Sequence, residues 1–132
     1  MSLKFEREMA ECFSEVGVFL LRSPGTISLH HPAVNSKGEP CEPHDDDAVA
    51  WSMWDLLFLH ARKLHKGKAA SLPLALFMEQ MRCVASNVLE RDVINWQYDP
   101  ERTTSDILQF VSLMINLLVD LSYVFFDPRI RY

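Results

Sequence analysis

Apolar residues recur at helical spacing in four segments of the chain. In the first segment they return every three or four positions, from Phe5 to Leu20, and the opposite side carries glutamates, as in an amphipathic helix. Thr103, followed three positions later by Asp106, predicts a capped start for the last segment. The four predicted helices cover residues 3–21, 48–65, 71–89 and 103–126. This pattern predicts an all-α fold, a four-helix bundle-like single domain over residues 1–132.

A long loop, Arg22 to Asp47, separates the first two predicted helices. Residues 26–30 alternate like one short strand, and Asn35–Gly38 has the composition of a turn, so the loop is expected to hold a short hairpin. The acidic run 45–47 is expected to open the second helix, because carboxylates accept the free amide hydrogens of a first turn. Loops of this length in compact domains are often functional.

The last predicted helix is apolar enough to be tested as a membrane span. Of the 20 residues from Ile107 to Phe126, 15 are apolar when tyrosine is counted. Polar groups nevertheless recur every three or four positions along one stripe, which a lipid-facing helix rarely keeps. The stripe consists of Gln109, Ser112, Asn116, Asp120 and the Tyr123 hydroxyl. We therefore predict the central helix of a bundle and no membrane span; the alternative is a helix with one buried face and a second apolar face in a dimer.

Charge and cysteine content narrow the function classes. The 132 residues include 13 Lys and Arg against 18 Asp and Glu, giving a net charge of −5. This balance disfavours direct nucleic-acid binding and favours a partner with a basic or neutral surface. The cysteines, Cys12, Cys41 and Cys83, are widely spaced and odd in number, and the first residues show no export signal. These features predict a cytoplasmic protein.

The loop also contains the best candidates for metal ligands, His31, Cys41 and His44, with His30 beside them. Imidazole and thiolate suit zinc, and Cys-x-x-His is a known ligand spacing. However, the chain has no second tight pair of ligands, and helix capping explains the three aspartates that follow. We expect neither a metal nor another cofactor, and keep as an alternative a metal- or small-molecule-binding protein that uses the loop from His30 to Asp47.

Nothing in the sequence forms a recognisable catalytic set. Cys12 and Cys83 lie on the apolar faces of their predicted helices and are expected in the core. Cys41 lies between Glu39 and Glu42, whose charges raise a thiol pKa and weaken its reactivity. No nucleophile, base and orienting group can be placed together. We therefore predict that the protein is not an enzyme.

The remaining histidines and the tryptophans have structural interpretations. His60 and His65 are five positions apart and point to different faces of the second predicted helix, so they are expected to be solvated at its end. Trp51, Trp54 and Trp96 are expected in the core and not as platforms for nucleic-acid bases.

Two stretches resemble a family of small uncharacterised bacterial and phage proteins. Residues 44–61, preceded by Asn35–Pro40, are similar to its Gly-x-Pro loop and the Ala-x-x-Trp helix that follows. Residues 93–108 resemble its Trp-x-x-Asp-Pro-x-Arg-Thr segment and last helix, with Gln97 and Tyr98 where the family tends to have Asn and Asp. The resemblance implies a helical fold and no established activity.

These observations favour a small acidic protein that acts by binding another protein. One class with these features is the phage or mobile-element inhibitor of a nucleic-acid-binding host complex, an anti-CRISPR-like protein whose acidic surface occludes a basic groove. A dimeric structural accessory protein is a further alternative. The carboxylates expected to contact the partner are Glu39, Glu42, Asp45, Asp46 and Asp47.

Overall fold

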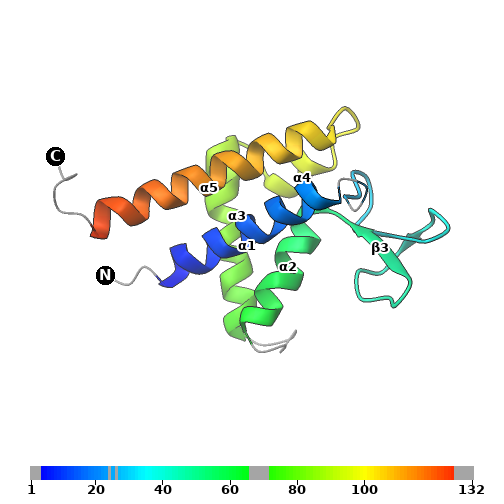
Figure 1. The fold of residues 1–132 in the computed structure, drawn as a ribbon, viewed down its shortest axis with the longest axis horizontal. Coiled ribbons are helices and arrows are strands. Elements are labelled where there is room, and N and C mark those ends of the chain that lie inside the picture. The colour runs from blue at the N-terminus through cyan, green and yellow to red at the C-terminus, as the bar shows by residue number, and fades with distance from the viewer. Residues whose placement is uncertain (1–3, 24, 26, 66–71, 127–132) are drawn as a thin grey trace.

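A computed structural model describes residues 4–23, 25, 27–65 and 72–126 (Figure 1). Within these ranges the chain forms five helices and three short strands. In chain order they are α1 (Lys4–Arg22), β1 (Ala33–Asn35), β2 (Pro40–Cys41), β3 (Ala48–Trp51), α2 (Met53–Leu64), α3 (Leu72–Leu89), α4 (Val93–Gln97) and α5 (Thr104–Phe126).

The helices pack as crossed pairs around one core. In Figure 1, α1 and α5 run side by side, while α2 and α3 cross them. Gly17 of α1 lies against Val111 and Ile115 of α5, which places the two helices in close contact. Because the axes cross, the structure does not confirm a four-helix bundle. The largest fully buried side chains include Met9, Phe13, Met53, Leu57, Leu74, Met81, Ile107 and Met114.

The helices with the clearest apolar periodicity match the predictions. In α1 most of the apolar face is buried, including Cys12, as expected, whereas Phe19 is exposed. The last helix begins at the predicted cap: the Thr103 hydroxyl accepts from the Asp106 N–H at 3.2 Å, and the Asp106 carboxylate accepts from the Thr103 N–H at 3.0 Å. The third helix spans Leu72–Leu89; Ser71, included in the prediction, lies outside the described residues.

The last helix is not the central helix of a bundle. Phe110, Val111 and Met114 are buried, but the polar stripe from Gln109 to Asp120 faces solvent. The stripe's Tyr123 side chain lies outside the described part of the chain. In the part of α5 whose side chains the structure describes, three large apolar residues are also exposed: Leu113, Leu117 and Val119. One buried face and a partly apolar outer face correspond to the alternative interpretation. No helix in the described part of the chain is long and apolar enough to cross a membrane.

A purely helical fold is contradicted by a three-stranded antiparallel sheet with strand order β2-β1-β3. The predicted turn at Asn35–Gly38 is confirmed, and Gly38 has φ +80°, a conformation that glycine adopts without strain. The strands, however, lie at different positions from those predicted. Within 26–30, Ile27 forms only an isolated bridge with Trp51, and Thr26 lies outside the described residues.

The second helix begins five residues later than predicted. Ala48–Trp51 pairs with β1, so Ser52 becomes the N-cap and its hydroxyl accepts from the Asp55 N–H at 3.1 Å. The acidic run 45–47 therefore does not cap this helix. Non-local pairing with β1 outweighs the local helical pattern of residues 48–51.

The short helix α4 was not predicted. It places Trp96 against Phe110, with ring centroids 5.1 Å apart, and the Arg102 guanidinium lies 4.1 Å from the centre of the Trp96 ring. Trp96 is buried, as expected, whereas Trp51 and Trp54 are partly buried at the edge of the core. Gln97 accepts a hydrogen bond from the Trp54 N–H at 3.0 Å. The two segments that carried the family resemblance therefore meet in the fold.

Candidate binding surface

The sheet and its connections, residues 33–51, form a unit that we call the acidic hairpin. Figure 1 shows this unit projecting from the helices at one end of the molecule. Its tip is shaped by Asn35, whose side-chain oxygen accepts from the N–H groups of Lys37 at 2.9 Å and Glu39 at 3.0 Å. This side chain fixes the turn through local hydrogen bonds, in the manner of an Asx turn.

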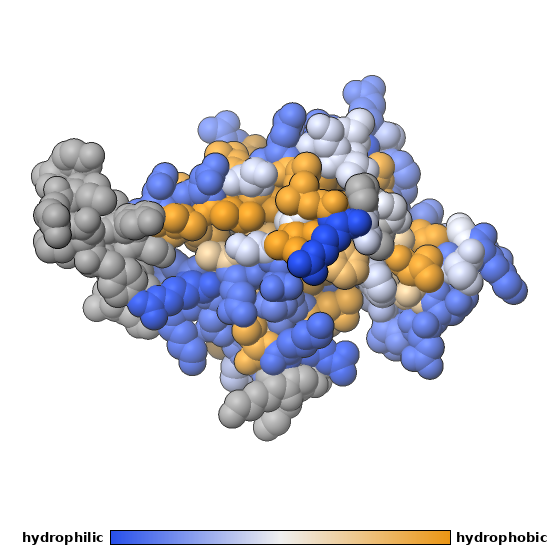
Figure 2. Space-filling view, viewed as in Figure 1, coloured by the Kyte–Doolittle hydropathy of each residue, from blue (hydrophilic) through white to orange (hydrophobic). Residues whose placement is uncertain are grey.

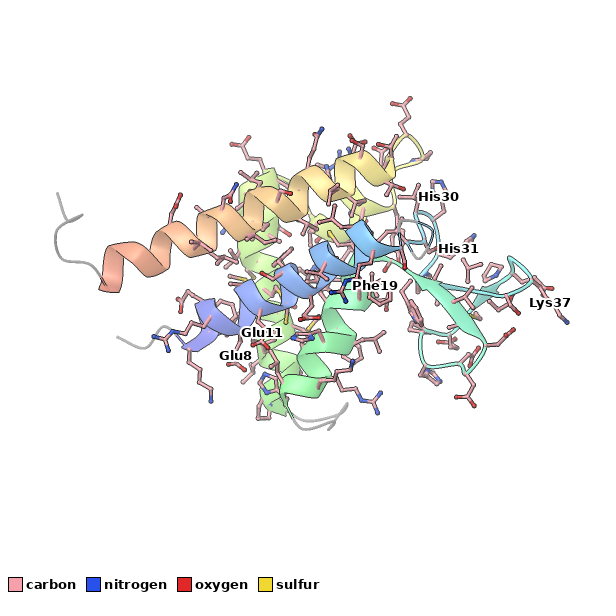
Figure 3. All side chains as sticks on the ribbon, viewed as in Figure 1. Glu8, Glu11, Phe19, His30, His31 and Lys37 are labelled. Atoms are coloured by element: carbon pink, nitrogen blue, oxygen red, sulfur yellow. The ribbon has the colours of Figure 1, made fainter. Side chains whose placement is uncertain are left out.

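All five predicted partner-binding carboxylates are exposed on the acidic hairpin. Lys37 is the only Lys or Arg within residues 33–51, and Figure 3 shows it at the tip. Five carboxylates against one ammonium group make this projecting unit strongly negative. The carboxylates are Glu39 before β2, and Glu42, Asp45, Asp46 and Asp47 between β2 and β3.

Two of the carboxylates help to order the backbone, and others are available to a partner. The Asp45 carboxylate accepts from the Glu42 N–H at 3.2 Å. The Asp47 carboxylate accepts from the Ser36 hydroxyl at 2.9 Å, which ties the β2–β3 connection to the hairpin turn. Within the described structure, the side chains of Glu39 and Asp46 make no hydrogen bond or ion pair. Hydrogen bonds within the hairpin therefore hold its backbone, and the exposed carboxylates give it a negative charge.

Trp51 anchors the acidic hairpin to the helices. Its indole N–H donates to the Pro43 carbonyl at 2.9 Å, and its backbone carbonyl accepts from the Ser28 N–H at 2.8 Å. Its ring packs edge-on against Phe19 of α1, with centroids 6.4 Å apart. The Ser52 N–H donates to the Pro32 carbonyl at 2.9 Å. These contacts connect the charged unit to both α1 and α2.

The candidate metal ligands do not converge. His30 and His31 are exposed and lie near the helices in Figure 3, away from the tip. Cys41 is partly buried in β2, and His44 is exposed in the β2–β3 connection. In residues 4–23, 25, 27–65 and 72–126, no group of three or more His, Cys, Asp or Glu side chains could hold a metal ion. The metal-binding alternative therefore has no supporting geometry there.

The three cysteines occupy different environments. Burial, followed by the charges of nearby glutamates, raises the pKa of Cys12 to about 12. For Cys41, partial burial and then the charges of Asp45 and Asp47 raise the thiol pKa, which agrees in direction with the effect expected from neighbouring carboxylates. Cys83 is exposed, so its predicted core position is wrong. It lies on the outer side of α3 with its sulfur 4.0 Å from the Glu79 carboxylate.

Sequence reasoning also missed two contacts between α1 and α2. The His60 imidazole lies 3.6 Å from the Glu11 carboxylate, and the His65 imidazole lies 3.6 Å from that of Glu8. Figure 3 shows both glutamates on α1, above α2. The two histidines are mostly buried, contrary to the expectation that they are solvated. Glu8 and Glu11 share one side of α1, but their partners are distant in sequence, so local spacing could not identify these pairs.

The fold and its projecting charge define a mostly helical protein with an acidic hairpin. Comparison of the chain with protein-family models, curated proteins and solved structures finds no match.

Proposed function

We propose that this protein binds another protein through the acidic hairpin and that the partner presents a basic surface. The observation that carries the proposal is the set of five exposed carboxylates on a projecting unit with a single lysine. Charges of one sign on a projecting unit produce a field that steers an oppositely charged partner and suppresses like-charged ones. No catalytic step or cofactor is part of the proposal.

The internal hydrogen bonds of the hairpin support this function. Asn35, Asp45 and Asp47 hold the turn and the β2–β3 connection, so binding requires less ordering of the backbone. The side chains of Glu39 and Asp46 remain available for direct ion pairs. At physiological ionic strength, charges are screened over about 8 Å, so the partner's basic residues must approach closely.

The most specific form of the proposal is a cytoplasmic inhibitor of a nucleic-acid-binding complex, of the kind that phages and mobile elements direct against a host. A groove that binds nucleic acid is lined with Lys and Arg, which neutralise phosphates. The carboxylates of the acidic hairpin would occupy that groove in place of phosphates. Binding should then compete with nucleic acid and weaken as salt concentration rises.

A second candidate function is that of a dimeric accessory protein. The exposed apolar residues of α5 favour it: Leu113 is 53% exposed, and Leu117 lies one turn further along the same side. In Figure 2, apolar surface is also visible over α1 and α5. Sedimentation equilibrium at micromolar concentration tests this candidate: a dimer that Leu117→Glu dissociates supports it, and a monomer excludes it.

The proposed function is tested by comparing two variants that remove the same number of charges. The hairpin variant replaces Glu39 and Glu42 with Ser, and Asp45 and Asp46 with Asn. The control variant replaces four exposed carboxylates elsewhere with amides. These are Glu79, Glu90, Glu101 and Asp120. Because Ser52 caps α2 and Asp47 is unchanged in both, the helices should remain intact.

Each protein is used to capture partners from the cytoplasm of the source cells, and a captured partner is then purified and titrated by calorimetry over a salt series. We expect wild type and the control variant to bind it with similar affinity. The hairpin variant should bind it at least about tenfold more weakly at low salt, which corresponds to about 1.4 kcal/mol. If the hairpin variant retains both its affinity and its salt dependence, the proposed function is wrong.

A further inference from the structure

A pocket lies beside the acidic hairpin, between α1, α2 and the end of β3. Its volume is about 210 Å³. The apolar residues that line it are Val16, Phe19, Trp51, Leu56 and Leu59. Val16 is 2% exposed and Leu56 8%, whereas Phe19 is 40% exposed. The pocket therefore extends from the edge of the core to the surface, where Phe19 forms part of its wall.

Trp51 belongs to both the pocket and the acidic hairpin. Its ring lines the pocket and packs against Phe19, while its indole N–H is bonded to Pro43 in the β2–β3 connection. That connection carries four of the five carboxylates of the hairpin. One wall of the pocket is therefore bonded to the connection that carries this negative charge.

The size of the pocket matches one side chain. Cavities of about 150 Å³ are known to hold benzene, whereas pockets for larger small molecules have volumes of about 300–1,000 Å³. At about 210 Å³, this pocket accommodates a phenylalanine or leucine side chain. Interfaces often place most of their binding energy in such an anchor, a bulky side chain inserted into a pocket and surrounded by polar contacts.

We propose that the pocket receives one bulky apolar side chain, phenylalanine or leucine, from the same basic protein segment that the acidic hairpin binds. This inference rests on the proposed function and defines the partner more closely: an apolar anchor flanked by Lys or Arg. Charge complementarity to the acidic hairpin selects this occupant, because Trp51 of the hairpin lines the pocket, whereas the exposed Glu15 and Lys63 balance each other in the lining itself. A second copy of this acidic chain would bring like charges together.

The α2 side of the pocket is consistent with an apolar anchor. His60 lines it, but its Nε2 atom is shielded from solvent and lies 3.6 Å from Glu11. That atom is therefore not available to a polar ligand. Among the described residues that line the pocket, Lys63 is the one cation, and it lies on α2, three residues beyond His60. The flanking basic residues of the partner are accordingly expected on the hairpin side.

The first test uses N-acetyl-phenylalaninamide as a probe of the anchor. The Trp51 indole N–H gives its own signal in a nitrogen–proton correlation spectrum, and we expect the probe to move this signal in a saturable manner. Phe19→Ala should abolish the shift. Leu21→Ala is the matched control on the same helix, because Leu21 is 71% exposed and does not line the pocket. The pocket inference is wrong if the probe does not move the Trp51 signal in wild type, or if the response of Phe19→Ala is unchanged.

The second test uses only the wild-type protein, so it does not depend on whether a variant folds. Two peptides, Lys-Lys-Phe-Lys-Lys and Lys-Lys-Gly-Lys-Lys, are titrated at low salt. Because burial of a phenylalanine side chain is strongly favourable, we expect the first peptide to bind about tenfold more tightly. Equal binding overturns the pocket inference and leaves the proposed function intact. If neither peptide binds but N-acetyl-phenylalaninamide moves the Trp51 signal, the pocket exists and the basic-partner function is wrong.

Discussion

Replacing Ser52 with alanine should destabilise the protein more than any change to the acidic run that precedes it. Ser52 is 1% exposed, its hydroxyl accepts from the Asp55 N–H, and it also donates to the Asp55 carboxylate. Loss of an N-cap costs about 1 kcal/mol, and loss of a hydrogen bond to a partly buried carboxylate costs about 1.5 kcal/mol. Ser52→Ala should therefore lower the free energy of unfolding by about 2.5 kcal/mol.

The matched control is Asp47→Ala, which alters the residue that local sequence patterns favour as a cap. In the structure, Asp47 accepts one exposed hydrogen bond from Ser36, so its loss should cost about 0.5 kcal/mol. Urea unfolding followed by far-ultraviolet circular dichroism measures both variants. With a urea m-value of about 2 kcal/mol/M, Ser52→Ala should lower the midpoint by about 1.2 M. Equal destabilisation by the two variants would refute the assignment of the helix start.

Three further outcomes follow from the structure. Thr103→Ala should lower the free energy of unfolding in urea by about 1 kcal/mol, because it removes the hydroxyl that accepts a hydrogen bond from the first turn of α5. An unchanged unfolding midpoint would contradict the assignment of Thr103 as the cap. Burial raises the folded pKa of Asp55 above 3.8, so the folded protein retains this proton to higher pH than the unfolded chain. The free energy of unfolding should consequently fall as pH rises from 3.8 through the folded pKa, and Asp55→Asn should flatten this slope in urea titrations at several pH values. Labelling with iodoacetamide at pH 8, followed by mass spectrometry, should modify the exposed Cys83 first and Cys41 more slowly, because the pKa of Cys41 is raised. Cys12 should be labelled only after unfolding, because it is buried and has a pKa of about 12. Labelling of Cys12 in the folded protein would contradict its placement.

The parts of the fold that were predicted correctly depend on local signals. The helices α1, α3 and α5 have long periodic apolar faces, and Thr103 with Asp106 forms a cap whose partners are three residues apart. The same spacing occurs at Ser52 and Asp55. That signal could have located the start of α2, but the acidic run offered an earlier cap of equal local quality.

The parts that were missed depend on contacts between residues distant in sequence. Residues 48–51 are compatible with a helix, and their strand is stabilised by pairing with β1, which no local pattern reveals. The position of Cys83 was misjudged because α3 has apolar residues on more than one side, among them the exposed Leu76. The pocket could not be predicted, because it forms where Phe19 of α1 contacts Trp51 of β3, and these residues are distant in sequence. The acidic carboxylates could be identified from sequence, since a dense charge run requires no knowledge of the fold.

Mapping where a basic probe binds shows whether the acidic hairpin is the surface that meets a basic partner. Uniformly nitrogen-labelled protein is titrated with pentalysine at low salt, and the shift of each backbone amide signal is measured. We expect the largest shifts to fall within residues 35–47 and to disappear in the variant that lacks the charges of Glu39, Glu42, Asp45 and Asp46. If the largest shifts fall on the helices, or if the variant shows equal shifts, the acidic hairpin is not the binding surface.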